Sequence, residues 1–242
     1  MSTDVPRGSL MIIVPAFNEE AAVGRVVEEI RSAVPGVPIV VIDDCSSDET
    51  AIRARLAGAK VLSLPHHLGL GGAVQAGYRL AYELGYEYVI RTDGDGQHDP
   101  QDIPRIYEAL LGLNCQMVIG SRFLNGENRH PSPSRSLGIR FFRLVLRPIL
   151  GRKVYDPTSG FVGVNRQALQ VFSKSFPLEY PEIEALVVLK RKAFQFVEVP
   201  CRMRPRLAGK SSITPLKSFY YIIHVLLGVF VNVLKYERRQ KD

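Results

Sequence analysis

The sequence predicts an α/β fold in which helices cover both faces of a mixed, mainly parallel sheet. Short apolar runs typical of buried strands alternate along the chain with longer amphipathic segments typical of helices. This alternation favours parallel strands joined by crossover helices. The chain has 242 residues, of which 46% are hydrophobic and 23% charged, and this composition is that of an ordinary globular domain.

The expected elements follow one another in strict order. Strands are expected at residues 9–14, 37–44, 59–65, 86–93 and 115–123, and helices at residues 17–34, 46–58, 69–85 and 100–113. We expect Asn18 to cap the first helix, with two glutamates in its first turn. Ser46 or Ser47 is expected to cap the second helix, and Pro100 to lie near the first position of the fourth.

Cysteine content and charge narrow the classes of function. The chain has three cysteines and no CxxC pair, which argues against a disulfide framework and a zinc site and fits a reducing cytosol. The N-terminal apolar run is interrupted by Pro15 and is interpreted as a strand, not as a secretory signal. The net charge of +7 fits nucleic acid, an anionic membrane surface or phosphorylated ligands.

Three acids, Asp93, Asp95 and Asp99, crowd into a turn after the strand expected at residues 86–93. Asp and Gly favour turns, so a plain turn is the first alternative. A calcium loop of the EF-hand type is excluded, because its fifth and twelfth positions would be Gln97 and Pro104. The remaining interpretation is a divalent metal, Mg²⁺ or Mn²⁺, that holds a polyphosphate with one or two carboxylates.

Other strands also run into acids. The first is followed by PAFNEE at residues 15–20, and the second by an acid pair at residues 43–44. Because the carboxyl ends of parallel strands share one edge, these acids should converge on one crevice, where an open α/β sheet binds its ligand. This convergence argues against nucleic acid as the partner. A phosphate-binding glycine loop at residues 208–212 is excluded, because Arg204 stands where its first glycine would be.

The ordered set of motifs resembles a known enzyme family. MIIVPAFNEE, VIDDCSSDET, HHLGLGGAVQAGY, DGDGQHDP, GSRF and DPTSGF follow one another within roughly residues 9–210. In this order they resemble a family 2 glycosyltransferase of the GT-A fold, a Rossmann-like nucleotide-diphospho-sugar transferase. DGDGQH, DPTSGF and the late RMRPRLAGKSS are most similar to the polyprenyl-phosphate (dolichyl-phosphate) mannose and glucose synthases.

The resemblance implies a nucleotide-sugar donor site. Asp95 would be the direct metal ligand, helped by Gln97, and Asp93 would face the metal and the sugar or ribose. A helix N-terminal turn is the alternative interpretation of the second-strand acid pair. The residues that would line the nucleotide are Pro15, Ala16, Phe17, Asn18, Glu19, Asp43, Asp44 and Asp93.

The resemblance also implies direct displacement at the anomeric carbon with inversion, and two classes of acceptor stay open. A lipid phosphate needs no general base but needs cations, whereas a saccharide hydroxyl needs a base, for which Glu182 or Glu184 would serve. Arg122 and Arg204 are expected to act in catalysis. Thr158, Ser159, Arg202, Arg206 and Lys210 are expected to bind the acceptor or its phosphate, although the alternating arginines could also form a solvated edge strand.

We expect a catalytic domain at residues 1–210 and a C-terminal amphipathic helix with a basic tail at residues 211–242. Residues 218–234 carry no formal charge and are flanked by lysines, but 17 residues are at the short limit for crossing a membrane. We interpret them as a helix that lies on the cytoplasmic face of a membrane, with packing in the core or in an oligomer as alternatives. A membrane-protein partner would be another chain. GDP-mannose and UDP-glucose are the leading donors.

Overall fold

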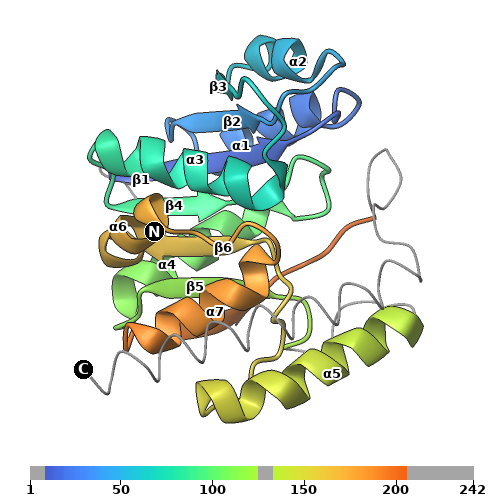
Figure 1. Cartoon of the computed structure of the whole chain (residues 1–242). Coiled ribbons are helices and arrows are strands. Elements are labelled where there is room, and N and C mark those ends of the chain that lie inside the picture. The colour runs from blue at the N-terminus through green and yellow to red at the C-terminus, as the bar shows by residue number, and fades with distance from the viewer. Residues whose placement is uncertain (1–8, 125–132, 206–242) are drawn as a thin grey trace.

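The computed structural model describes residues 9–124 and 133–205, and within them seven strands form one sheet. The strand order is β3-β2-β1-β4-β6-β5-β7 (Figure 1). The strands are β1 (Leu10–Ala16), β2 (Ile39–Asp43), β3 (Lys60–Ser63), β4 (Tyr88–Arg91), β5 (Met117–Ser121), β6 (Val162–Asn165) and β7 (Phe196–Pro200). β6 is antiparallel to β4 and β5, and the other neighbouring pairs are parallel. The predicted mixed, mainly parallel sheet is confirmed.

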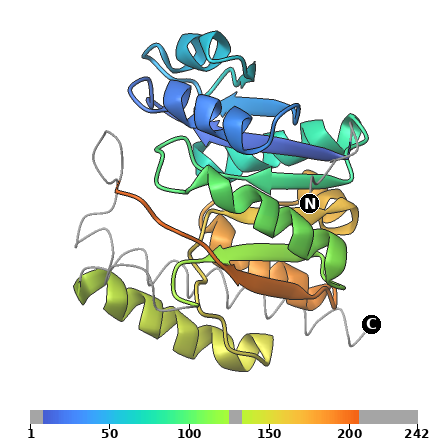
Figure 2. The same cartoon turned by 180° about the vertical axis from the view of Figure 1, so that it is seen from behind.

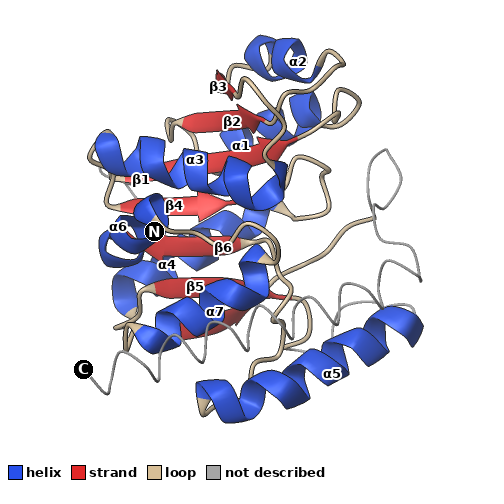
Figure 3. Cartoon of the chain, viewed as in Figure 1, coloured by secondary structure: helices blue, strands red, loops and turns tan. Residues whose placement is uncertain are grey.

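Helices cover both faces of this sheet (Figure 3). They are α1 (Val23–Ala33), α2 (Thr50–Leu56), α3 (Gly69–Glu83), α4 (Ile103–Gly112), α5 (Pro133–Leu150), α6 (Arg166–Lys174) and α7 (Pro181–Arg191), with a short 3-10 helix at Pro100–Asp102. α3, α6 and α7 lie on one face, and α1 and α4 lie on the other, which is turned toward the viewer in Figure 2.

The side chains of β1 alternate between two buried clusters, as a strand covered on both faces requires. Met11 and Ile13 belong to the cluster under α3, α6 and α7, whereas Leu10, Ile12 and Val14 belong to the cluster under α1 and α4. Each face of the sheet is therefore sealed by its own apolar layer.

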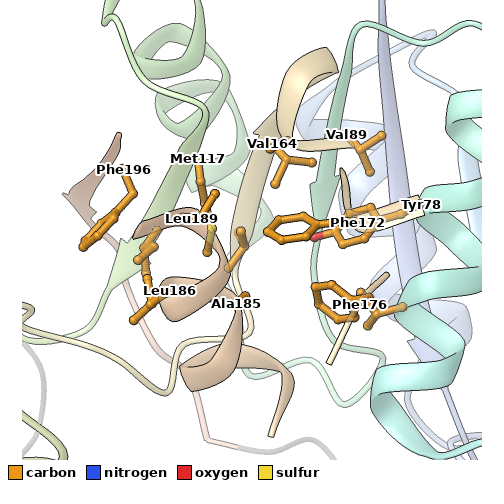
Figure 4. Close-up of a cluster of buried hydrophobic side chains, with 14 of the residues drawn as sticks. Tyr78, Val89, Met117, Val164, Phe172, Phe176, Ala185, Leu186, Leu189 and Phe196 are labelled. Carbon is orange, nitrogen blue, oxygen red and sulfur yellow. The ribbon is translucent and has the colours of Figure 1, made fainter. Parts of the chain in front are cut away.

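Aromatic rings fill the first cluster (Figure 4). The ring of Phe172, on α6, stacks on Tyr78 of α3 with 5.8 Å between centroids. Phe176 meets Phe172 edge-on at 5.1 Å. Burial raises the pKa of Tyr78 to about 12, so its hydroxyl stays protonated near neutral pH. These contacts join α3 to α6 and fix both helices against the sheet.

The first predicted helix cap is wrong. α1 begins at Val23, and Asn18 adopts a positive φ of 53°. The side-chain oxygen of Asn18 accepts the backbone N–H of Ser47 at 2.9 Å, while its own N–H donates to Ser46 Oγ at 3.0 Å. The residues after β1 are therefore tied to the loop after β2 and are not available to start a helix.

The second predicted cap is wrong for a related reason. α2 begins at Thr50, and Asp48 Oδ1 accepts the N–H of Thr50 at 2.9 Å. Ser46 and Ser47 are instead engaged with Asn18, as described above. After residue 123, the sequence analysis predicted none of the described elements, namely β6, β7 and helices α5 to α7.

Two sequence-based expectations concern parts of the chain that the structure does not describe. The helix expected at residues 218–234 and the domain boundary after residue 210 lie outside the described residues. Among residues 9–124 and 133–205, no helix is long and apolar enough to cross a membrane.

We predict that Phe172→Ala lowers the free energy of unfolding by about 3–5 kcal/mol, because it leaves a cavity between α3 and α6. Chemical denaturation measures this loss. Leu111→Ala is the control, because Leu111 is 54% exposed and its truncation should change stability by less than about 0.5 kcal/mol. Equal losses in the two variants would contradict the assignment of the core.

Candidate active site

The candidate site lies at the sheet edge where the parallel strands β1, β2, β4 and β5 end (Figure 1). β6 runs the opposite way, so the loop that leads into it, residues 156–161, reaches the same edge. α7 begins there as well, since Glu182 in its first turn contacts Arg91 at the end of β4. The predicted convergence of strand ends on one edge is confirmed.

Asp93 and Asp95 follow β4 directly. Asp95 is buried, and its Oδ1 accepts the backbone N–H of Gln97 at 3.0 Å. Burial opposes ionisation of Asp93, but the charges of His98, when it is protonated, and of Arg91 outweigh this effect and lower the pKa of the Asp93 carboxyl. Two carboxylates one residue apart, Asp93 with a lowered pKa and the buried Asp95, therefore stand at the end of the central strand.

The residues present fit a hard divalent cation that arrives with phosphate oxygens. Asp93 Oδ1 is buried and has no hydrogen-bond partner among the described residues, so it is free to bind a ligand. In the part of the chain that the structure describes, no three His, Cys, Asp or Glu side chains are grouped to hold a metal by themselves. Mg²⁺ takes one or two carboxylates and completes its shell with substrate phosphates and water, and Asp93 with Asp95 matches this need.

Arg91 is a residue of the candidate site that the sequence analysis missed. Its side chain is 2% exposed, its Nη2 donates to Glu182 Oε1 at 2.5 Å, and the same nitrogen lies 3.5 Å from Asp93 Oδ1. Burial alone would lower the pKa of Arg91, but Glu182 and Asp93 outweigh it and raise it. The available signal was a charged residue at the end of an apolar strand.

His98 was also missed. Its ring stacks on Phe161 with 5.0 Å between centroids, and its Nδ1 accepts the backbone N–H of Asp93 at 3.3 Å. Because Nδ1 accepts a hydrogen bond, the proton of the neutral ring lies on Nε2. Burial lowers the pKa of His98, although Asp93 opposes this effect. His98 therefore supports the backbone of the acidic turn.

Arg122, after β5, is clamped to the loop before β6. Its Nε and Nη2 donate to the two carboxylate oxygens of Asp156, each at 2.6 Å, and Nη2 also reaches Thr158 Oγ1 at 2.8 Å. Asp156 is fully buried, so Arg122 and Asp156 form a bidentate ion pair that is shielded from water. Arg122 thereby fixes Thr158 in the loop before β6. The catalytic role predicted for Arg122 and the acceptor contact predicted for Thr158 stay predictions.

Ser159 and Glu198 hold the same loop in place. The Ser159 hydroxyl donates to the Gly120 carbonyl oxygen at 2.6 Å, so its proton is engaged within the protein. Glu198 of β7 accepts the backbone N–H groups of Tyr155 and Asp156 at 2.8 and 2.7 Å. Burial raises the pKa of the Glu198 carboxyl. The predicted ligand contact of Ser159 stays a prediction, and its observed contact is structural.

The predicted nucleotide-binding residues other than Asp93 lie at the ends of β1 and β2. Pro15 and Ala16 close β1 in register with Ile42 and Asp43 of β2. The N–H of Glu19 donates to Thr50 Oγ1 at 2.8 Å. These contacts bring the segment after β1 and the start of α2 to one side of the edge.

An exposed aromatic pair stands beside them. The ring of Phe17, 44% exposed, lies 4.1 Å from the ring of His67, and His67 Nδ1 lies 2.9 Å from Asp44 Oδ2. Asp44 Oδ1 accepts the N–H of Leu68 at 2.7 Å, so Asp44 fastens the loop before α3. Asp43 accepts the N–H of Ser46 at 3.2 Å. The predicted nucleotide contacts of Asp43 and Asp44 stay predictions, and His67 is a residue that was missed.

The alternating arginines run beside the acidic turn. Met203 pairs with His98 in an isolated antiparallel bridge, and the N–H of Arg204 donates to the Gln97 carbonyl oxygen at 2.7 Å. The guanidinium of Arg204 is divided between Glu29 of α1 and Asp99, at 2.6 Å each. These contacts fasten the acidic turn to α1, and no described contact places the Arg204 side chain beside Asp93 or Asp95.

The remaining predicted cations differ in position. The Arg202 side chain is 63% exposed and lies 3.5 Å from Asp99 Oδ2. Arg206 and Lys210 lie outside the described residues. Glu182 and Glu184 both lie in the first turn of α7, and Glu182 is bound to Arg91.

Comparison with known protein families assigns the chain to one of them. The sequence model of glycosyl transferase family 2 matches residues 11–172, which include the ends of β1, β2, β4 and β5. The chain belongs to this family. The predicted family membership is confirmed. The protein has the GT-A fold that the sequence analysis predicted.

Relatives of this glycosyltransferase are named for transfer to lipid phosphates. A UDP-N-acetylglucosamine–dolichyl-phosphate N-acetylglucosaminyltransferase of Methanococcus voltae is 28% identical over 246 residues, covering 90% of this chain and 96% of the relative. An undecaprenyl-phosphate mannosyltransferase of Micrococcus luteus is 30% identical, covering 85% and 87% of the two chains.

Solved structures show the same fold with ligands. Glucosyl-3-phosphoglycerate synthase of Mycobacterium tuberculosis, in complex with Mn²⁺, UDP and glucosyl-3-phosphoglycerate, matches with a TM-score of 0.68 and 26% identity. The match covers 93% of the glycosyltransferase described here and 79% of that chain.

We predict that Asp156→Asn destabilises the glycosyltransferase by about 3 kcal/mol, because it leaves Arg122 as a buried charge without its ionic partner. Glu83→Gln is the matched control, since the Arg79–Glu83 pair is exposed and should contribute less than about 0.5 kcal/mol. Urea denaturation of both variants is the measurement. An equal, small change in the two would show that the Arg122–Asp156 clamp does not stabilise the loop before β6.

Proposed function

We propose that this glycosyltransferase moves a sugar from a nucleotide-diphosphate sugar to a polyprenyl phosphate, with inversion at the anomeric carbon. The observation that carries the proposal is the pair of carboxylates after β4, Asp93 and Asp95. Among the described residues, Asp93 keeps a buried oxygen without a hydrogen-bond partner. The names of the relatives from Methanococcus voltae and Micrococcus luteus support the class of acceptor.

The donor would lie across the sheet edge. The nucleoside would face Phe17, with Asp43 toward the ribose, and its diphosphate would reach the acidic turn after β4. Asp95 would hold Mg²⁺ or Mn²⁺, with Asp93 and Gln97 beside it. The metal, when bound, neutralises the diphosphate as it leaves. A structural relative crystallised with Mn²⁺ and UDP supports this arrangement.

The acceptor would be a phosphate monoester, whose second pKa is about 6 and which is largely dianionic at neutral pH. Such a nucleophile needs no proton removed, so the protein needs only to position it. Arg202 is the exposed described cation of the predicted acceptor set, and Arg206 and Lys210 follow it in the sequence. The engagement of Glu182 with Arg91 disfavours the alternative in which Glu182 removes a proton from a saccharide hydroxyl.

The lipid acceptor implies work at a membrane surface. We propose a peripheral position at the cytoplasmic face, supported by the charge-free run at residues 218–234 and the basic residues that follow it. Assembly into a homo-oligomer or binding to a separate membrane protein would also hold the enzyme at the membrane surface.

We predict transfer of radiolabel from a sugar nucleotide to a short polyprenyl phosphate, measured as product that extracts into organic solvent. A panel of UDP- and GDP-sugars, each with Mg²⁺ or Mn²⁺, identifies the donor. EDTA should abolish transfer. Product that forms only with water-soluble acceptors would contradict the lipid-phosphate proposal and favour a hydroxyl acceptor.

We predict that Asp95→Asn lowers turnover about a hundredfold or more while the protein stays folded, because loss of a metal ligand removes several kcal/mol of charge stabilisation. Single-turnover transfer at limiting Mn²⁺ is the measurement. Asp99→Asn is the control. It removes a carboxylate from the same turn, but Asp99 contacts Arg204 and the 3-10 helix and is not a proposed metal ligand. Near-normal turnover in Asp95→Asn would contradict the metal assignment.

A further inference from the structure

Arg91 is a buried cation whose charge the proposed reaction does not itself require. It ends β4, two residues before Asp93, and only 2% of its side chain is exposed. A buried charge is costly unless it is paired, so its partners define its role. Its strongest contact is with Glu182 at 2.5 Å, and Asp93 lies 3.5 Å away, beyond the usual length of a hydrogen bond.

Two buried atoms of this cluster lack hydrogen-bond partners. Within the described residues these are Arg91 Nε and Asp93 Oδ1. Arg91 therefore attracts Asp93 through charge but does not occupy the oxygen that faces it. An arrangement of this kind orients a carboxylate and leaves it able to bind a cation.

Gly160, in the loop before β6, packs against the side chains of Asp93 and Arg91. A Cβ at this position would lie 2.6 Å from Asp93 Oδ2 and 2.7 Å from Arg91 Nη2. The loop backbone therefore fits directly against the ion pair, and a larger residue would displace the ends of these two side chains. Figure 1 shows the short β4 beside β6, whose leading loop supplies Gly160.

We propose that Arg91 is a positioning residue for Asp93 and that Glu182 is the fixed counter-ion of Arg91, not the base of the reaction. The inference rests on the proposed function, because the role of Asp93 is defined there. Glu182 reaches Arg91 from the first turn of α7, so the start of this helix is part of the support of the metal-binding turn.

The Arg91–Glu182 pair determines how removal of one partner should affect Asp93. If Glu182 loses its charge, Asp93 becomes the nearest remaining carboxylate of Arg91. Arg91 would then draw Asp93 into a direct ion pair and reduce its availability for a cation. A residue that acted only as a base would leave cation binding unchanged.

The experiment compares Glu182→Gln, Arg91→Gln and the double variant in two measurements. The first is thermal unfolding without metal or nucleotide. The second is binding of Mn²⁺ in the presence of UDP or GDP, followed by the electron paramagnetic resonance signal of free Mn²⁺. Glu83→Gln is the control, because Glu83 forms an exposed ion pair with Arg79 on α3, away from this cluster.

Each single variant should lower the Tm by roughly 6–20 °C, and the double variant by clearly less than the sum, because it removes both charges together. Glu182→Gln and Arg91→Gln should each weaken Mn²⁺ binding roughly tenfold, as expected of residues that orient a metal ligand. Glu83→Gln should change neither quantity. Additive losses of Tm would overturn the pairing.

Gly160→Ala tests the same cluster without removing a charge. It should weaken Mn²⁺ binding, because its Cβ pushes against Asp93 and Arg91. Gly163→Ala is the matched control: its Cβ would meet Ile106 and Leu110 in the core, so it should lower the Tm and leave Mn²⁺ binding unchanged.

Two results would overturn the proposal in distinguishable ways. Loss of transfer in Glu182→Gln with wild-type Tm and Mn²⁺ binding would identify Glu182 as the base. Failure of the wild-type protein to bind Mn²⁺ with either nucleotide would contradict the proposed function, and with it the role of Asp93. The metal-free Tm comparison would still report whether Arg91 and Glu182 are paired.

Discussion

Buried carboxylates must be matched by positive charge, and this requirement governs the carboxyl edge of the sheet. Two arginines with little exposure satisfy it. Arg91 is bound to Glu182 and lies near Asp93, and Arg122 is bound to both oxygens of Asp156. Together they place positive charge beside acidic side chains that lie close together at this edge. The charges of His98, when it is protonated, Arg91 and Arg122 lower the pKa of the Asp93 carboxyl despite its burial.

The fold brings these charges together from segments far apart in the sequence. β6 is the antiparallel strand between β4 and β5, so the loop before it returns to the edge where its neighbours end. That loop carries Asp156, which holds Arg122, and Gly160, which lies against Asp93. Glu198 of β7 fixes the loop from its other side. The strand that breaks the parallel order thus completes the site.

Much of the architecture could be predicted from the sequence. Five apolar runs predicted the first five strands and the edge where they meet. β1, β2 and β5 are buried throughout and leave a strong signal, whereas β3 is partly exposed. β6 has four residues, and α6 and α7 follow it closely, so periodicity gave little to distinguish them. The capping error at Asn18 has a different cause: this residue binds Ser47 across the edge, a contact between distant segments that local capping rules do not include.

The candidate site was predicted in outline but not in its pairings. The acidic turn after β4 was found because Asp93 and Asp95 lie in one short motif. The partners of charged residues were not found, because an ion pair such as Arg91–Glu182 joins positions 91 residues apart. The catalytic role expected of Arg204 stays a prediction. The contacts of its guanidinium with Glu29 and Asp99 were not predicted, because the motif identifies a segment without giving the direction of its side chains.

The most direct test of the proposed site is a crystal structure of the protein with Mn²⁺ and a nucleoside diphosphate. The proposed arrangement predicts Mn²⁺ within bonding distance of an Asp95 carboxylate oxygen, with the diphosphate at the carboxyl end of β4 and Arg91 still bound to Glu182. A nucleotide bound away from this edge, or Mn²⁺ coordinated without either Asp93 or Asp95, would contradict it.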